Sequence, residues 1–287
     1  DFSSNIALVA AVETGENAVL LAQKIVAELE QSPEFRSVSV TTPGFINFTV
    51  TDEYLLEAVR GIIRSPDAYG RSDLGKESRV LVEYISPNPL GPLTLANGRG
   101  AFVGEAIARV LELYGCTVMR ECYVNDRGNQ VDEIGKTIIG EGEQYAGDYV
   151  NALKKRIKEK TAREAGEQAV AIIMEEMIKP VIRSTGIHFD QYFSEKSLYQ
   201  TGVYKKAFEQ LKLRGLVYEA DGATWLMSTK FGDDKDRVLI KSTGEQTYLA
   251  SDIAYHSYKI ERGYHRIITE LGADHFTEAN VVKKIVE

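Results

Sequence analysis

A strand, a turn and a helix follow one another between residues 80 and 115. Residues 80–82 are all apolar and predict a buried parallel strand. A dense turn comes next, with Pro87, Pro89, Gly91 and Pro92. Apolar residues then recur at helical spacing until Gly115, a typical residue for a helix end: Phe102, Ile107, Val110, Leu111 and Tyr114. This order predicts the opening of a Rossmann-type unit, whose helix N-terminus suits a phosphate.

The same stretch contains the spacing E-x-x-S-P-N-P-x-G-P-L-x-x-x-x-x-R-G, beginning at Glu83. This spacing resembles the nucleotide-binding signature of class I arginyl-tRNA synthetases. In that family His-Ile-Gly-His, or a close variant, usually follows Pro-Leu, whereas this sequence has Thr94-Leu95-Ala96-Asn97. Tryptophanyl-tRNA synthetases, which are also class I, generally have Thr and Asn at the two histidine places, and both side chains can donate hydrogen bonds. Ala96 replaces the glycine that lets adenine lie close to the backbone.

Three later stretches are similar to the same family. Residues 118–124 predict a second parallel strand, and N-D-R-G-N-Q at 125–130 follows at its carboxyl end, where open α/β sheets bind ligands. Without that context, such a polar run is as often an ordinary turn. The longest match covers residues 231–256, where Tyr248 and Asp252 are four apart and share a helix face. Residues 266–275 predict a final strand that ends in G-A-D-H.

These patterns predict an α/β protein with two domains. Residues 1–67 form a small α+β module that begins inside a helix and resembles the N-terminal additional domain of the family, which contacts the tRNA elbow. Asn47 is its candidate tRNA contact, although its amide could equally satisfy the turn. Residues 78–287 form the Rossmann-type class I synthetase catalytic domain, with an insertion at about 131–235 in which residues 145–185 are helical.

Composition limits the location and the partners. The net charge is −8, so the whole molecule is not a basic nucleic-acid binder, but a local basic face is enough for tRNA. The apolar runs are far too short to span a bilayer, and no signal-peptide pattern is present, so we expect a cytoplasmic protein. Cys116 and Cys122 are expected to be free thiols, with no zinc pattern in the sequence. The resemblance implies a monomer.

The resemblance also implies the chemistry. Arginine would be activated with ATP, with Mg²⁺ on the phosphates, to arginyl-adenylate, and then transferred to the 3′ end of tRNA(Arg). A guanidinium has five donors in a planar fork, so its selection needs matched carboxylates or carbonyls. The residues implied for arginine are Glu83, Asn88, Tyr248 and Asp252. Those implied for ATP are Pro89, Gly91, Thr94, Ala96, Asn97, Gly272, Asp274 and His275.

Within this set, the catalytic residues would be Thr94, Asn97 and His275. The residues expected to border the active site are Asn125, Asp126 and Gln130. A K-M-S-K-type loop and an anticodon-binding domain would lie beyond Glu287, so we expect this chain alone to be inactive or nearly so in aminoacylation. Two alternatives stay open: a catalytically inactive synthetase-like paralogue that binds tRNA, and an unrelated Rossmann nucleotidyltransferase without arginine specificity.

Overall fold

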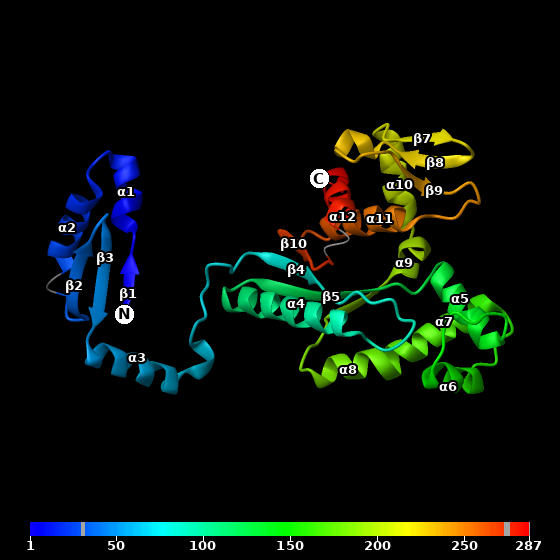
Figure 1. The fold of residues 1–287 in the computed structure, drawn as a ribbon, viewed down its shortest axis with the longest axis horizontal. Coiled ribbons are helices and arrows are strands. Elements are labelled where there is room, and N and C mark those ends of the chain that lie inside the picture. The colour runs from blue at the N-terminus through cyan, green and yellow to red at the C-terminus, as the bar shows by residue number, and fades with distance from the viewer. Residues whose placement is uncertain (30–31, 273–275, 287) are drawn as a thin grey trace. The chain divides into compact units, whose positions relative to one another are not determined.

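The computed structural model describes residues 1–29, 32–272 and 276–286 (Figure 1). The chain divides into two compact units, Asp1–Arg71 and Ser72–Glu287. Among the helices that the structure describes, none combines the length and the apolar character that a membrane crossing requires.

The first unit is a three-stranded antiparallel sheet with helices. Its strands are β1 (Phe2–Ser4), β2 (Phe35–Thr41) and β3 (Phe45–Val50), in the order β1-β3-β2. The helices are α1 (Ile6–Thr14), α2 (Ala18–Leu29) and α3 (Asp52–Arg64), followed by a short 3₁₀ turn at Pro66–Ala68. Residues from α1, α2 and β3 form its core: Ala7, Ala22, Val26, Ile46 and Phe48.

The expectation that the chain begins inside a helix is wrong. Residues 2–4 form β1, which pairs antiparallel with β3. The Phe2 ring stacks on that of Phe48 with 4.7 Å between the ring centroids. This cross-strand aromatic pair favours the extended conformation, because it covers the buried Phe48.

The second unit contains a four-stranded parallel sheet in the order β10-β4-β5-β6. Its strands are β4 (Arg79–Glu83), β5 (Thr117–Val124), β6 (Gln191–Ser194) and β10 (Arg266–Thr269). The expected strand at 80–82 and the helix after it are confirmed as β4 and α4 (Leu95–Leu113). Strand β6 comes from the range that was expected to be an insertion. Figure 1 shows α4 on one side of the sheet and helices α11 and α12 on the other.

Helices between β5 and β6 share a core with the parallel sheet. They are α5 (Asn129–Ile139), α6 (Asp148–Arg156), α7 (Ala162–Ile173), a π-helical turn (Met174–Ile178) and α8 (Lys179–Ser184). The range expected to be helical, 145–185, is thus largely helical, with a break after α6 because Ile157 is extended and Thr161 caps a new helix by accepting from the Glu164 N–H. Helices α5 and α7 cross closely at Gly135, where an added Cβ would lie 1.7 Å from the Ala162 carbonyl oxygen.

The rest of the second unit is a small antiparallel sheet with helices. Its strands are β7 (Val217–Ala220), β8 (Ala223–Leu226) and β9 (Arg237–Ile240). The expected strand at 238–240 is present as β9, but it pairs with β8 and so lies outside the parallel sheet. The helices are α9 (Glu195–Gln200), α10 (Val203–Leu213), a 3₁₀ turn (Ser228–Phe231), α11 (Tyr248–Glu261) and α12 (Phe276–Val286). Apolar residues of α10, α11 and α12 share one core.

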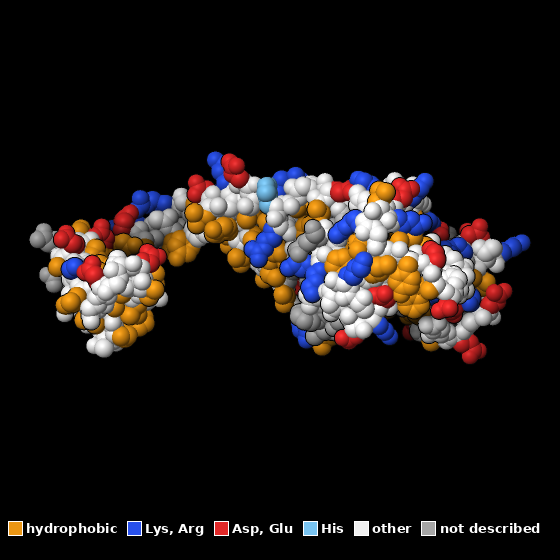
Figure 2. Space-filling model, turned by 90° about the horizontal axis from the view of Figure 1, so that it is seen from above, with side chains coloured by type: hydrophobic (Ala, Val, Ile, Leu, Met, Phe, Trp, Pro, Cys, Tyr) orange, Lys and Arg blue, Asp and Glu red, His pale blue; other side chains and the backbone are white. Residues whose placement is uncertain are grey.

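The surface is of mixed charge. On the face seen in Figure 2, Lys and Arg side chains lie among Asp and Glu side chains. Several of the basic residues are paired, as in the contact of Arg156 with Glu176. The basic run at 154–158, at the end of α6, is thus partly neutralised.

Candidate active site

The first turn of α4 is built by the residues that replace the usual histidines. Thr94 is the N-cap, and its Oγ1 accepts a hydrogen bond from the Asn97 N–H at 3.4 Å. In return, Asn97 Oδ1 accepts from the Thr94 N–H at 2.9 Å and from its hydroxyl at 2.7 Å. This reciprocal capping box fixes the helix start, whose remaining N–H groups and dipole favour an anion. Ala96 lies exposed in the same turn.

The turn before α4 is held from two directions. The Tyr149 hydroxyl of α6 donates to the Leu90 carbonyl at 2.9 Å, and an added Cβ at Gly91 would lie 3.1 Å from that hydroxyl. Ser86 has a φ of 33°, which is rare for a residue with a side chain, and its hydroxyl donates to Glu83 Oε1 at 2.8 Å. These contacts therefore fix the conformation of the turn between β4 and α4.

The carboxyl ends of β4 and β5 bring several predicted residues together. The Asn125 amide donates to Asn88 Oδ1 at 2.7 Å, which joins the two polar turns. Asp126 accepts from the Lys196 N–H at 2.9 Å and from the Ser194 hydroxyl, and so fixes the junction of β6 and α9. Gln130 lies half-buried in the first turn of α5, and Pro89 lies buried in the turn after β4. This geometry supports the expected grouping of these residues along one edge of the sheet.

Glu83, at the end of β4, is buried and fully engaged. Its Oε2 accepts from the Lys259 ammonium and from the Thr269 hydroxyl at 3.3 Å. Lys259 is itself inaccessible to solvent, on α11. Burial alone would raise the pKa of Glu83, but the positive charge of Lys259 holds it below its usual range. No sequence pattern indicates this buried ion pair.

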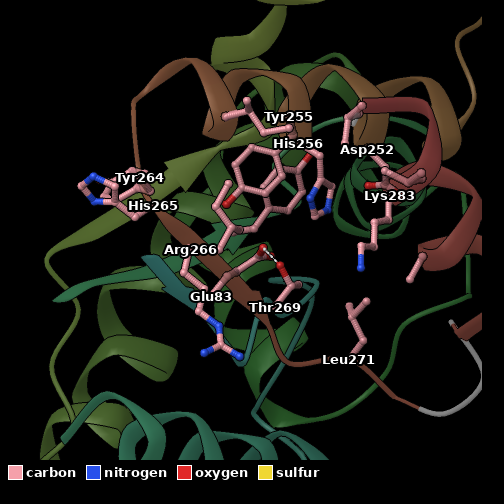
Figure 3. Close-up of a pocket in the computed structure, with 16 residues that line it drawn as sticks. Glu83, Asp252, Tyr255, His256, Tyr264, His265, Arg266, Thr269, Leu271 and Lys283 are labelled. Atoms are coloured by element: carbon pink, nitrogen blue, oxygen red, sulfur yellow. Dashed lines mark hydrogen bonds between the residues drawn. The ribbon is translucent and has the colours of Figure 1, made fainter. Parts of the chain in front are cut away.

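A cavity of about 470 Å³ lies beside this ion pair, between β10, α11 and α12. Two of the residues predicted to bind arginine, Glu83 and Asp252, line it. Figure 3 shows the hydrogen bond between Glu83 and Thr269, with Asp252, His256 and Lys283 around the same cavity. Burial and then the nearby Lys259 charge lower the pKa of His256 to about 4, so its imidazole is neutral at pH 7. Tyr248, one turn before Asp252 on α11, is 57% exposed.

Glu195 is a candidate that sequence reasoning missed. It follows β6 directly, is 3% exposed, and its Oε1 accepts from the hydroxyl of Ser251, the neighbour of Asp252 on α11. Its Oε2 is enclosed and, among the described residues, has no hydrogen-bond partner. Burial raises the pKa of Glu195. A carboxylate directly after a short buried strand was the available signal, but it lay inside the expected insertion.

Tyr123 of β5 was missed as well. It lines the same cavity, and its hydroxyl is enclosed without a hydrogen-bond partner in the described part of the chain. Nearby, the Arg127 guanidinium carbon lies 3.5 Å from the centroid of the Tyr199 ring. Tyr199 in turn contacts Ser251 at 2.8 Å between the hydroxyl oxygens. Polar groups of β5, α9 and α11 therefore meet beside the cavity.

The remaining predicted residues lie elsewhere. Asp274 and His275 fall outside the described residues, and Gly272 lies exposed after β10. Asn47 belongs to β3 of the first unit, and its amide donates to Thr41 Oγ1 at 2.7 Å, so the hairpin supplies a partner for it. Cys116 and Cys122 are free thiols, and burial raises the pKa of Cys122. No group of three His, Cys, Asp or Glu residues within the described ranges could hold a metal ion.

Comparison with known proteins gives two family matches. Residues 1–50 match the family described as arginyl tRNA synthetase N terminal domain. Residues 59–140 and 132–270 match tRNA synthetases class I (R), catalytic domain. The second match alone covers more than half of the chain.

Individual relatives agree with these matches. An arginine–tRNA ligase from Desulfosudis oleivorans is 39% identical in an alignment of 299 positions, gaps included, that covers 96% of this chain and 54% of the relative. One from Bacillus subtilis is 36% identical in an alignment of 311 positions that covers 100% of this chain and 56% of the relative. The chain thus spans about half the length of the curated relatives that it matches.

Solved structures show the same fold. A putative arginyl-tRNA synthetase from Campylobacter jejuni superimposes with a TM-score of 0.73 and 31% identity, covering 82% of this chain and 57% of that one. The arginyl-tRNA synthetase from Thermus thermophilus gives a TM-score of 0.59 at 23% identity, covering 90% of this chain and 47% of that one, and supports the fold alone. The expected fold class, an α/β Rossmann-type catalytic domain after a small N-terminal domain, is confirmed, and the chain belongs to the class I arginyl-tRNA synthetase family.

Proposed function

We propose that this chain supplies the arginine- and ATP-binding parts of an arginine–tRNA ligase. The enzyme would activate arginine with ATP to arginyl-adenylate and then transfer the arginyl group to the 3′ end of tRNA(Arg). One observation carries the proposal: Glu83 at the end of β4 and Asp252 of α11 line one cavity, and Glu195, directly after β6, accepts from the neighbour of Asp252 at the edge where such sheets bind ligands. A substrate with a permanent positive charge, such as a guanidinium, suits this group of carboxylates.

Glu195 and Asp252 are the proposed partners of the guanidinium. A planar guanidinium can bind carboxylates through paired N–H groups, whereas an ammonium acts as a point charge. Glu195 has an enclosed oxygen without a partner among the described residues, so a bound guanidinium would satisfy it. The same contact would lower the Glu195 pKa, which burial now raises. Asn88 and Tyr248 would add neutral hydrogen bonds at the rim.

ATP would lie with its phosphates at the start of α4. The turn at Pro89 and Gly91 and the first turn from Thr94 to Asn97 would face the nucleotide, together with residues 272–275. No covalent enzyme intermediate is involved, so catalysis consists of positioning the arginine carboxylate against the α-phosphate and stabilising charge there. The α4 dipole and the capped first turn fit this role.

Mg²⁺ would be bound mainly through the ATP phosphates. It keeps several of its waters in such sites and uses few protein ligands. The ion would neutralise charge on the phosphates.

The proposed enzyme works as a cytoplasmic monomer with tRNA(Arg), arginine and ATP as its partners. The first unit, through Asn47 among others, would contact the tRNA elbow. Its family match supports this role. Asn47 would have to exchange its hydrogen bond to Thr41 for one to the RNA.

A catalytically inactive paralogue that binds tRNA is the second candidate. The replacement of His-Ile-Gly-His by residues 94–97 favours the paralogue. Thr94 and Asn97 are hydrogen-bonded to each other, so these groups are already engaged when a phosphate arrives. Titration with a non-hydrolysable ATP analogue separates the two candidates. Binding that is lost in Thr94→Ala supports the enzyme, and no binding to the unmodified protein favours the paralogue.

Asp252→Asn tests the arginine site. The substitution keeps the shape and removes the charge, and a hydrogen bond to a charged group is worth about 1.5–3 kcal/mol. Calorimetry should show arginine binding weakened by at least about tenfold, with ATP-analogue affinity unchanged. Glu261→Gln is the matched control, because Glu261 is exposed near the end of the same helix and pairs with Lys206. Equal losses for both ligands would indicate a folding defect, and an unchanged arginine affinity would remove Asp252 from the pocket.

A further inference from the structure

The Tyr123 hydroxyl is a buried polar group that makes no hydrogen bond to the described part of the chain. Tyr123 is 6% exposed, and its ring packs at 4.5 Å from that of Tyr255 and 6.1 Å from that of Phe193, between centroids. These contacts use only the ring. The hydroxyl is enclosed and has no hydrogen-bond partner within the described ranges, a condition that costs stability. A phenylalanine would pack equally well at this position.

The surroundings of the hydroxyl suggest why it is retained. Tyr123 lines the cavity together with Glu83 and Asp252. Burial and then the negative charges of Glu195, Asp252 and Glu83 raise the pKa of Tyr123 well above its usual value. The hydroxyl therefore keeps its proton and can both donate and accept a hydrogen bond.

A count of donors and acceptors gives the hydroxyl a role. A guanidinium presents five N–H donors. Carboxylates near the site already accept hydrogen bonds within the protein, Glu83 from Ser86, Lys259 and Thr269, and Glu195 Oε1 from Ser251. Carboxylates that are already engaged leave at least one of the five donors for another acceptor. Tyr123 lines the cavity with Glu83 and Asp252, and its hydroxyl has no partner of its own in the described chain.

We propose that Tyr123 is a specificity determinant for arginine, an inference that rests on the proposed function. Its hydroxyl accepts one N–H of the guanidinium and donates its proton to a carboxylate of the cavity. An ammonium has three donors, which Glu195 and Asp252 can satisfy without it. Tyr123 therefore favours arginine over lysine rather than cations in general.

Tyr123→Phe separates this role from a structural one. If the hydroxyl served the fold, its removal would lower the melting temperature. We expect the opposite, an unchanged melting temperature or an increase of about 2–4 °C, because an unpaired buried group is removed. Arginine binding, measured by calorimetry, should weaken about tenfold, while lysine and ATP-analogue affinities stay within about twofold.

Tyr204→Phe is the matched control. Tyr204 also has an enclosed hydroxyl without a partner in the described chain, but it packs beside Tyr199 and Phe208, away from the lining of this cavity. Its variant should bind arginine like the unmodified protein. Arginine affinity unchanged in Tyr123→Phe, or reduced equally in both variants, would overturn the inference and leave the proposed function intact. Failure of the unmodified protein to bind arginine would overturn the proposed function itself, and the role of Tyr123 with it.

Discussion

The buried pair of Glu83 and Lys259 offers the sharpest test of how this site is held. We predict that Lys259→Met destabilises the second unit by about 3–5 kcal/mol at pH 8, because removal of one partner leaves a buried charge uncompensated. Methionine keeps most of the volume of the lysine stem. Glu83 retains the Ser86 and Thr269 hydroxyls as partners, which limits the loss.

The loss should depend on pH in a defined direction. In the unmodified protein the folded-state pKa of Glu83 lies below its usual value, so the pair stabilises the fold above about pH 4.5 and loses that effect on acidification. Without Lys259, burial would instead raise the Glu83 pKa. The variant is then penalised most at high pH, and the penalty shrinks as Glu83 becomes protonated. The difference between the two proteins should therefore fall from pH 8 towards pH 5.

Urea unfolding followed by tryptophan fluorescence measures this difference. Trp225 is the only tryptophan in the sequence and belongs to β8, so its signal reports on the second unit. Lys206→Met is the control, since Lys206 pairs with exposed Glu261 and should contribute less than about 1 kcal/mol. Glu83→Gln combined with Lys259→Met should recover much of the loss, because no charge stays buried. A loss below about 1 kcal/mol at pH 8, or one that grows on acidification, would refute the reasoning.

Two further predictions concern the ligands. Glu195→Gln should weaken arginine binding by at least about tenfold in calorimetry. Because burial raises the Glu195 pKa, its ionised form destabilises the fold as pH rises, so the variant should gain stability at pH 8 and little at pH 4 in the same unfolding assay. A loss of stability at pH 8 would contradict this account. Ala96→Gly should tighten binding of an ATP analogue by removing a methyl from the expected adenine face, and an unchanged or weaker affinity would show that the first turn of α4 already accommodates Ala96.

Local patterns in the sequence were sufficient for much of the fold. The apolar run of β4, the turn after it and the helical spacing of α4 were predictable because neighbouring residues determine each of them. Pairing between distant segments was not. Strand β9 has the same apolar character whether it joins a parallel or an antiparallel sheet, and only its partner β8 decides. The first strand was missed because residues 2–4 are too few to show a period.

Contacts within the site were hard to predict for a related reason. Asn125 was expected at the carboxyl end of a strand and Asn88 was assigned from the family resemblance, and the structure joins the two by a hydrogen bond. Lys259 is 176 residues from Glu83, and nothing in its local sequence marks it as the partner of a carboxylate. Glu195 follows a strand too, but β6 is four residues long and was read as part of the insertion. Sequence spacing therefore predicts which residues lie at the ends of strands. It does not predict which distant side chains contact them.

The contrast between Glu83 and Glu195 explains how three carboxylates can lie close together, where Glu83 and Asp252 line the cavity and Glu195 contacts Ser251, the neighbour of Asp252. If all were unpaired, mutual repulsion and burial would favour their protonated forms, and the site would lose affinity for a cation. Lys259 neutralises Glu83 permanently, and His256 stays neutral at pH 7 because burial lowers its pKa to about 4. Glu195 keeps an unsatisfied oxygen at a cost in stability, as expected of a group that gains its partner only when the ligand binds.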